Sequence, residues 1–103
     1  MISVESDVLR LLADPLRAQI VSLLAREALC TCHLIEMTGA KQTNISNHLR
    51  ALRKAGVVDT EPCGRFTYYR LRPDVLDELA ARMTELADAA RAVRADARKR
   101  PCT

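Results

Sequence analysis

The stretch from residue 41 to residue 71 constrains the fold most, because its apolar period changes once, within a few residues. Residues 41–55 carry apolar side chains at helical spacing, on one face of a helix: Ile45, Leu49 and Leu52. Gly56 stands where helices commonly end. Residues 57–71 then read VVDTEPCGRFTYYRL, two β-rich runs around Cys63-Gly64. This pattern predicts a polar-faced helix followed directly by a β-hairpin, with Tyr69 and Leu71 packed inward and Pro62 on an exposed edge.

Three shorter helical segments precede this unit. Apolar side chains at positions 4, 8, 11 and 12 predict a short first helix. Asp14-Pro15 is a start signal for the second helix, an N-cap acceptor followed by proline at the first helical position. That second helix should bury apolar side chains at four positions: Leu16, Ile20, Leu23 and Leu24. The third begins near Cys30-Thr31, carries Leu34, Ile35 and Met37, and ends at Gly39.

A long helix closes the chain. Pro73 ends the hairpin, and Asp74 is a reasonable cap for this last helix. Apolar side chains then recur in steps of three and four: Leu76, Leu79, Met83, Leu86, Ala90, Val93 and Ala97. Such a stripe on a terminal helix needs a partner, and a symmetric homodimer through the first and last helices supplies one. The expected fold is mostly α with a small β-hairpin, a winged helix-turn-helix in which four helices, the hairpin and a fifth helix come in that order.

Length and composition set the broad class. The 103 residues allow one domain, which we place at 1–97, with 98–103 as a flexible basic tail. No apolar run is long enough to span a bilayer, and MISVESDVLR lacks the basic region of a signal peptide. We therefore expect a cytoplasmic protein, where four cysteines suggest metal binding or redox chemistry before disulfides. No nucleophile–base set, phosphate loop or cofactor motif indicates an enzyme.

Positive charge is concentrated in the middle of the chain. Residues 1–40 carry three basic and five acidic side chains, a net charge of −2, and residues 73–103 carry six of each. Residues 41–72 carry seven basic and two acidic side chains, a net charge of +5. This distribution is typical of a protein that presents one face to phosphates, although a solvated surface would explain charge alone.

Four stretches together resemble the arsenic-repressor (ArsR/SmtB) family of metal-sensing bacterial repressors. They are LLADPLRAQIVSLL (11–24), ALCTCHL (28–34), KQTNISNHLRALRKAGVV (41–58) and GRFTYYRL (64–71), in the order and spacing of that family. The resemblance implies a dimeric winged-helix repressor that leaves its operator when a metal or metalloid binds. Some relatives sense zinc through His and Asp/Glu pairs on the last helix. Residues 74–97 contain no histidine, so we expect no zinc site of that kind on the last helix.

The polar face of the fourth helix suits the major groove, since amides and hydroxyls can read base edges and backbone N–H groups can bind phosphate. The resemblance places five of its side chains nearest the bases: Gln42, Thr43, Asn44, Ser46 and Asn47. Lys41, Arg50 and Arg65 are then expected to hold phosphates or to reach into the minor groove. DNA binding itself needs no cofactor. His48 lies near the buried face and is interpreted as a structural hydrogen-bonding residue between the two helices of the motif before a metal ligand.

Cys30 and Cys32 stand where arsenic-sensing members carry a cysteine pair. Thiolates are soft ligands suited to As(III), Sb(III), Cd(II) or Pb(II), and a helix N-terminus favours the thiolate form. On a regular helix these two positions point about 200° apart, so binding one ion should distort the start of the third helix. The family pattern has a third cysteine where this chain has Ile35, so another donor is needed.

The sequence leaves the third donor and the inducer open. Cys102 on the tail is the first candidate for the third donor, Cys63 at the hairpin turn the second, and two-coordinate binding with an outside thiol the third alternative. His33 matters as a ligand for zinc or cadmium. The leading functional hypothesis is a repressor released by As(III) or Sb(III). The alternatives are the same fold sensing Cd(II), Pb(II) or thiol oxidation, and a dimeric adaptor that binds no DNA.

Overall fold

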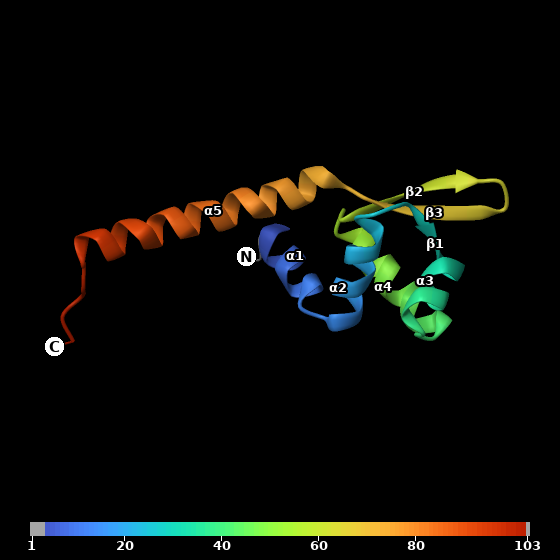
Figure 1. Ribbon diagram of the computed structural model, residues 1–103, viewed down its shortest axis with the longest axis horizontal. Helices are drawn as coiled ribbons and strands as arrows, with labels where there is room; N and C mark the ends of the chain where they lie inside the picture. Colours follow the sequence, from blue (N-terminus) through green and yellow to red (C-terminus); the bar gives the residue numbers. More distant parts are fainter. Residues whose placement is uncertain (1–3, 103) are drawn as a thin grey trace.

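The computed structural model describes residues 4–102 and shows a winged helix-turn-helix with one long terminal helix (Figure 1). The expected class, mostly helical with a small antiparallel hairpin, is confirmed. Residues 1–3 and Thr103, which belong to the expected domain and tail, lie outside the described residues. The elements in chain order are α1 (Val4–Leu12), α2 (Pro15–Leu24), β1 (Leu29–Cys30), α3 (Thr31–Thr38), α4 (Gln42–Lys54), β2 (Val58–Cys63), β3 (Phe66–Leu71) and α5 (Pro73–Asp96).

The helix boundaries agree with the local signals in the sequence. The Asp14 carboxylate accepts hydrogen bonds from the backbone N–H groups of Leu16 and Arg17, at 2.9 and 3.0 Å, and Pro15 comes directly after it. Gly39 ends α3 with a φ of 73°, in the left-handed region that glycine adopts without strain. The Asp14 cap fixes where α2 begins. Gly39 fixes where α3 ends, and so where the short turn into α4 starts.

One core joins the first four helices to the sheet. Its most buried side chains come from the first four helices, from β1 and from the start of β2: Val8, Ile20, Leu24, Leu29, Leu34, Ile45, Leu49, Leu52, Val57 and Val58. Leu16 and Leu23 pack against this core half-buried. Met37, one of the three apolar side chains predicted on α3, is 48% exposed and lines an open pocket.

The sheet has three strands, which corrects the expectation of a two-stranded hairpin. β1 pairs antiparallel with β3, so the strand order is β1-β3-β2. β2 and β3 pair from Val58 opposite Leu71 to Cys63 opposite Phe66. β3 is therefore the central strand, and Pro62 stands on the edge strand as expected, where its missing N–H costs no ladder bond. Tyr69 and Leu71 pack against the core, as predicted.

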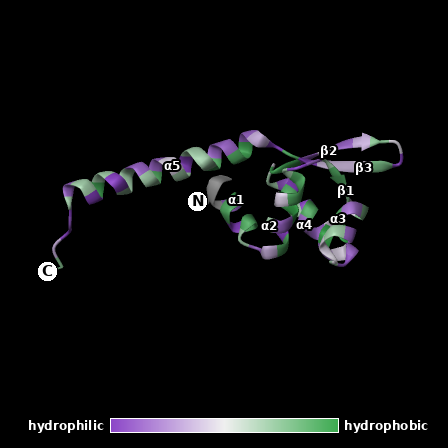
Figure 2. Cartoon of the chain, viewed as in Figure 1, coloured by the Kyte–Doolittle hydropathy of each residue, from purple (hydrophilic) through white to green (hydrophobic). Residues whose placement is uncertain are grey.

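α5 leaves the body of the protein and carries its apolar stripe into the open. The molecule measures 63 × 26 × 24 Å, and the far half of α5 packs against no other element in Figure 1. Met83, Leu86 and Val93 are 39%, 58% and 43% exposed, and hydrophobic and hydrophilic residues alternate along the helix in Figure 2. The cap is Arg72 instead of the expected Asp74, because Pro73 occupies the first helical position. Within residues 4–102, no helix is both long and apolar enough to cross a bilayer.

Candidate DNA interface and inducer site

α4 presents its predicted polar face to solvent. Its apolar side chains are 0–1% exposed, which fixes the rotation of the helix: Ile45, Leu49 and Leu52. The side chains predicted to meet DNA therefore point outward and are exposed except for the half-buried Ser46: Lys41, Gln42, Thr43, Asn44, Ser46, Asn47 and Arg50. Arg50 donates a hydrogen bond of 3.2 Å to the Asn47 side chain, one turn earlier. The face is thus a ready set of donors and acceptors at a helix N-terminus.

Ion pairs within residues 41–72 determine which basic side chains of this segment keep an uncompensated charge. Arg70 bonds Asp59 at 2.9 Å and Glu61 at 3.1 Å, across β2 and β3, and Arg72 bonds Asp74 at 2.9 Å. Both carboxylates of residues 41–72 are used in this way. Within residues 4–102, the other basic side chains of the segment have no ion pair: Lys41, Arg50, Arg53, Lys54 and Arg65. The unpaired positive charge therefore lies on α4 and at the tip of the wing.

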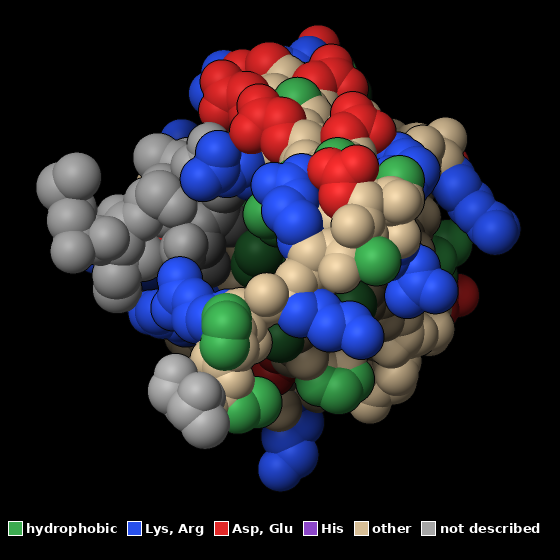
Figure 3. Space-filling view, turned by 90° about the vertical axis from the view of Figure 1, so that its left-hand side faces the viewer, with side chains coloured by type: hydrophobic (Ala, Val, Ile, Leu, Met, Phe, Trp, Pro, Cys, Tyr) green, Lys and Arg blue, Asp and Glu red, His purple; other side chains and the backbone are tan. Residues whose placement is uncertain are grey.

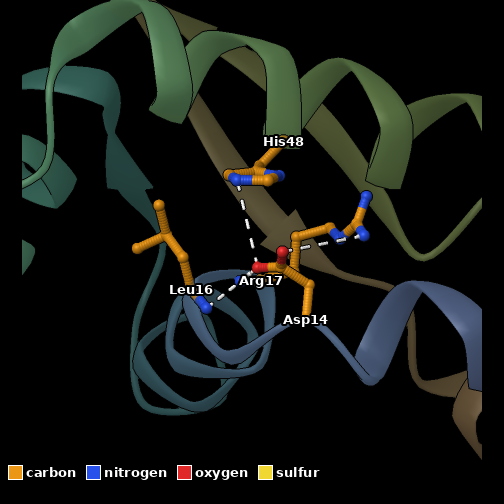
Figure 4. A network of polar contacts seen from close by, with 4 residues as sticks. All are labelled: Asp14, Leu16, Arg17 and His48. Carbon is orange, nitrogen blue, oxygen red and sulfur yellow. Dashed lines mark hydrogen bonds and ion pairs between the residues drawn. The ribbon is translucent and has the colours of Figure 1, made fainter.

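His48 reaches a different partner from the one expected. Its Nε2 lies 4.0 Å from Asp14 Oδ1, so it contacts the capping residue of α2 and not the other helix of the motif, α3 (Figure 4). Arg17 lies on the other side of the same carboxylate, also at 4.0 Å. The backbone N–H of Arg17 holds the pKa of Asp14 below its ordinary value, and the nearby His48 and Arg17 charges act in the same direction. This network holds α4 against the start of α2, and we call it the seat of α4.

Cys30 lies outside α3, which corrects the geometry assumed from the sequence. It is the N-cap, in an extended conformation with φ −90° and ψ 171°, and it is 6% exposed. Cys32 is within the first turn and exposed. The angle of a regular helix therefore does not relate the two thiols. The Cys30 Sγ lies 3.3 Å from His33 Nδ1, which also accepts a hydrogen bond of 3.2 Å from the Cys30 backbone N–H.

The other two cysteines lie away from this pair within one chain. Cys102 follows α5, whose C-terminal end lies at the opposite end of the molecule's long axis from α3 (Figure 1). Cys30 lies opposite Tyr68 of β3, and Cys63 lies on β2, the strand on the other side of β3, two residues beyond the partner of Tyr68. At standard sheet spacings the Cα atoms of Cys30 and Cys63 are therefore about 12 Å apart. Residues 4–102 contain no ready cluster of three His, Cys, Asp or Glu side chains for a metal ion.

Sequence reasoning undervalued two residues beside the thiols. His33 was weighed as a ligand for zinc or cadmium, and Tyr68 was assigned no role, yet the His33 ring lies against the Tyr68 ring, with 5.9 Å between centroids. A signal was available for His33, because the third helical position commonly reaches back to the N-cap backbone in a capping box. No local signal marked Tyr68, since its contact depends on the pairing of β1 with β3.

Comparisons with known proteins agree with this architecture. Residues 14–60 match the family described as "Bacterial regulatory protein, arsR family". The chain is 40% identical to the arsenic resistance transcriptional regulator ArsR1 of Pseudomonas putida over 80% of this chain and 65% of that protein, just under two thirds of its length. It is 32% identical to the arsenical resistance operon repressor of Staphylococcus aureus over 72% of this chain and 71% of that protein. A cadmium resistance regulatory protein, CadC of Lactococcus lactis, is 35% identical over 65% of this chain and 57% of its own.

Solved structures share the fold. An ArsR-like transcriptional regulator from Rhodococcus superposes with a TM-score of 0.79 and 26% identity, over 89% of this chain and 88% of the other. A homodimeric winged helix-turn-helix DNA-binding domain from Mycobacterium bovis superposes with a TM-score of 0.63 and 28% identity, over 93% and 85%. The chain therefore belongs to the arsR family of bacterial regulatory proteins, whose members regulate transcription and are not enzymes.

Proposed function

We propose that this protein is a homodimeric repressor that leaves its operator DNA when As(III) or Sb(III) binds the thiolates of Cys30 and Cys32. The observation that carries the proposal is that the thiol-bearing start of α3 and the exposed polar face of α4 belong to one packed helix pair. A change at the thiols therefore reaches the DNA-binding face through direct contact. Couplings of this kind are typically worth about 1–3 kcal/mol.

The donor set fits a soft metalloid. Two thiols two residues apart offer two sulfur ligands, and Cys32 is open to solvent. Cys30 is buried beside His33, so it must leave this contact if both sulfurs are to share one ion. That movement disturbs the cap of α3. A metalloid bound there would supply covalent bonds to sulfur strong enough to hold the displaced arrangement.

Cys102 remains our first candidate for a third sulfur. Within one chain it lies at the far end of α5, so a second copy must bring it to α3. A homodimer through α1 and α5 supports this, because α5 of each copy would extend toward the body of the other. Cys63 is the second candidate, and an outside small thiol is the alternative that needs no further protein ligand.

The contact between Cys30 and His33 favours one further inducer class. A thiol and an imidazole 3.3 Å apart form a mixed sulfur and nitrogen set, which suits Cd(II) and zinc better than As(III). A cadmium resistance regulator among the relatives supports testing this alternative. Thiol oxidation between Cys30 and Cys32 is tested in the same experiment.

The test is DNA binding by fluorescence anisotropy, with the duplex that the protein itself selects from a random library. Binding should weaken steeply between two salt concentrations, because phosphate contacts release counterions. Arsenite should release the duplex, whereas Cys30→Ser and Cys32→Ser should bind DNA as the wild type does and resist release. Cys102→Ser measures whether the tail contributes.

Each contrary result has a distinct meaning. Absence of salt-sensitive DNA binding would overturn the repressor and leave a protein–protein adaptor. Release by Cd(II) or by diamide, with no response to arsenite, would replace the metalloid by a metal or by oxidation. A normal response of Cys102→Ser would remove the tail from the site.

A further inference from the structure

Cys30 belongs to two elements at once. It is the last residue of β1 and the N-cap of α3. In the sheet it stands opposite Tyr68 of β3, and Leu29 stands opposite Tyr69. β3 is the central strand and forms the wing together with β2. A displacement of Cys30 therefore acts on the wing as well as on the helix pair α3–α4.

His33 contacts both the cysteine and the wing. Its Nδ1 lies 3.3 Å from the Cys30 sulfur and accepts the backbone N–H of the same residue at 3.2 Å. Its ring packs on the ring of Tyr68 at 5.9 Å between centroids, tilted by 57°. One imidazole thus connects the thiol, the start of α3 and the central strand of the wing.

The two rings have space for a second arrangement. An open pocket of about 350 Å³ borders them, and it is lined by Glu27, Ala28, Leu29, His33, Glu36, Met37 and Tyr68. When Cys30 leaves His33, the ring loses a partner on one side and faces this open space on the other. Coupling between sites requires an element with two discrete arrangements, and the pocket gives this ring pair room for a second one.

We propose that His33 and Tyr68 are positioning residues that tie Cys30 to the wing, so that inducer capture reorients the hairpin in addition to the recognition helix. The inference rests on the proposed function and adds a second output to it. β1 contributes two residue pairs to one edge of β3. If this pairing were lost, the base of the wing would still be held by the core packing of Val58, Tyr69 and Leu71, and the contact at Tyr68 would be released.

The wing carries a natural reporter, because Phe66 is the only phenylalanine of the chain. It is 55% exposed and begins β3, two residues before Tyr68 and on the same face. The full protein labelled with 4-fluorophenylalanine should give one ¹⁹F resonance, and sodium arsenite should shift or broaden it in the absence of DNA. The same label in Cys30→Ser should not respond.

Two variants test the link itself. Tyr68→Leu removes the ring from the strand, and His33→Gln keeps a side chain that can reach the N-cap backbone but loses the ring contact. The measured quantity is the ratio of DNA affinity without and with arsenite. Each variant should still lose free thiols to arsenite, while its ratio falls by about 2- to 30-fold relative to the wild type. Phe66→Leu is the matched control for Tyr68→Leu, because it also replaces an aromatic ring on the same face of β3 but outside the pairing with β1. It should keep the wild-type ratio of DNA affinities.

The outcomes separate this inference from the function on which it rests. Arsenite that consumes the thiols of Cys30 and Cys32 and releases DNA, with an unmoved ¹⁹F resonance, overturns the link to the wing and leaves the repressor intact. Wild-type ratios in Tyr68→Leu or His33→Gln do the same. Arsenite that leaves both thiols free overturns both proposals, because the link then has no input.

Discussion

α4 and α5 each expose one long face, but the chain buries the apolar face of α4 alone in its own core. The inner face of α4 is fully buried in the core of its own chain, and a polar network through Asp14 and His48 seats it on α2. No residue of α5 is fully buried, and the stripe that begins against the core continues into solvent at Met83, Leu86 and Val93. The outer face of α4 is therefore available to a partner of different chemistry, whereas the apolar stripe of α5 is not buried by its own chain.

The charges of the two helices point to different partners. Successive residues turn by about 100°, which puts six carboxylates of α5 within an arc of about 100°, opposite the apolar stripe: Asp74, Asp77, Glu78, Glu85, Asp88 and Asp96. Figure 3 shows acidic side chains gathered at the top of the molecule, over α5. α4 carries unpaired basic residues and no acidic residue. The comparison supports the proposed polyanion for α4 and the proposed second copy of the apolar helix for α5.

The largest effect should come from a charge in the stripe of α5. We expect Leu86→Glu to raise the dissociation constant of the homodimer by about 1,000-fold or more, since an interface hot spot contributes about 2 kcal/mol or more and a symmetric dimer contains the change twice. Leu86 is the best position because Leu79 also packs against its own core, so a charge there would disturb the fold. Sedimentation equilibrium measures the dimer, and anisotropy measures the resulting loss of DNA affinity.

The matched control is Ala81→Glu, on the acidic side of the same helix. It adds the same charge to the same element and should leave the dimer intact. A monomeric wild type, or equal effects of both variants, would remove the distinction drawn between the two faces of α5.

A smaller effect is expected on α4, and it separates two kinds of contact. Asn47→Ala should weaken binding to the selected duplex by about 5- to 150-fold, as expected for the loss of a base contact worth about 1–3 kcal/mol, and should leave the salt dependence unchanged. Lys41→Ala should weaken binding to all duplexes alike and lower the slope of log affinity against log salt by about one. Anisotropy titrations at several salt concentrations measure both.

Arg82→Ala is the control for charge alone, because Arg82 lies on α5 and is paired with Glu85. It should change neither affinity nor slope. If it weakened DNA binding as much as Lys41→Ala, the assignment of the polyanion to α4 would be wrong.

Sequence patterns predicted the helices because their signals are local. Asp14-Pro15, Gly39 and Gly56 mark boundaries through backbone chemistry that does not depend on the rest of the fold. The period of residues 42–54 also fixed which side of α4 faces outward. The cap of α5 could have been placed correctly too, since proline favours the first helical position and thereby makes Arg72 the cap.

The missed features are non-local. β1 has two residues, too few to show an alternation, and it exists because Leu29 and Cys30 meet a strand about 40 positions later in the sequence. Cysteine is not among the preferred N-cap residues, so Cys30 was interpreted as part of the helix. The same pairing places Tyr68 beside His33. The position of the thiol pair could thus be predicted from sequence, but its connection to the wing could not.

The smallest predicted effect concerns the seat of α4. The Arg17 backbone N–H lowers the pKa of Asp14 in the folded state. The charged carboxylate therefore stabilises the fold above the pKa of Asp in the unfolded chain, near 4, and this stabilisation is lost as pH falls through the lower pKa of the folded state. Asn is an equally good cap without a charge. Asp14→Asn should therefore melt close to the wild type at pH 7 and lose less stability between pH 5 and pH 2, as measured by circular dichroism. Because this seat lies within one chain, the difference between the two proteins should not depend on protein concentration, in contrast to the effect of Leu86→Glu. A difference that grew on dilution would mean that the dimer, and not α2, holds α4 in place.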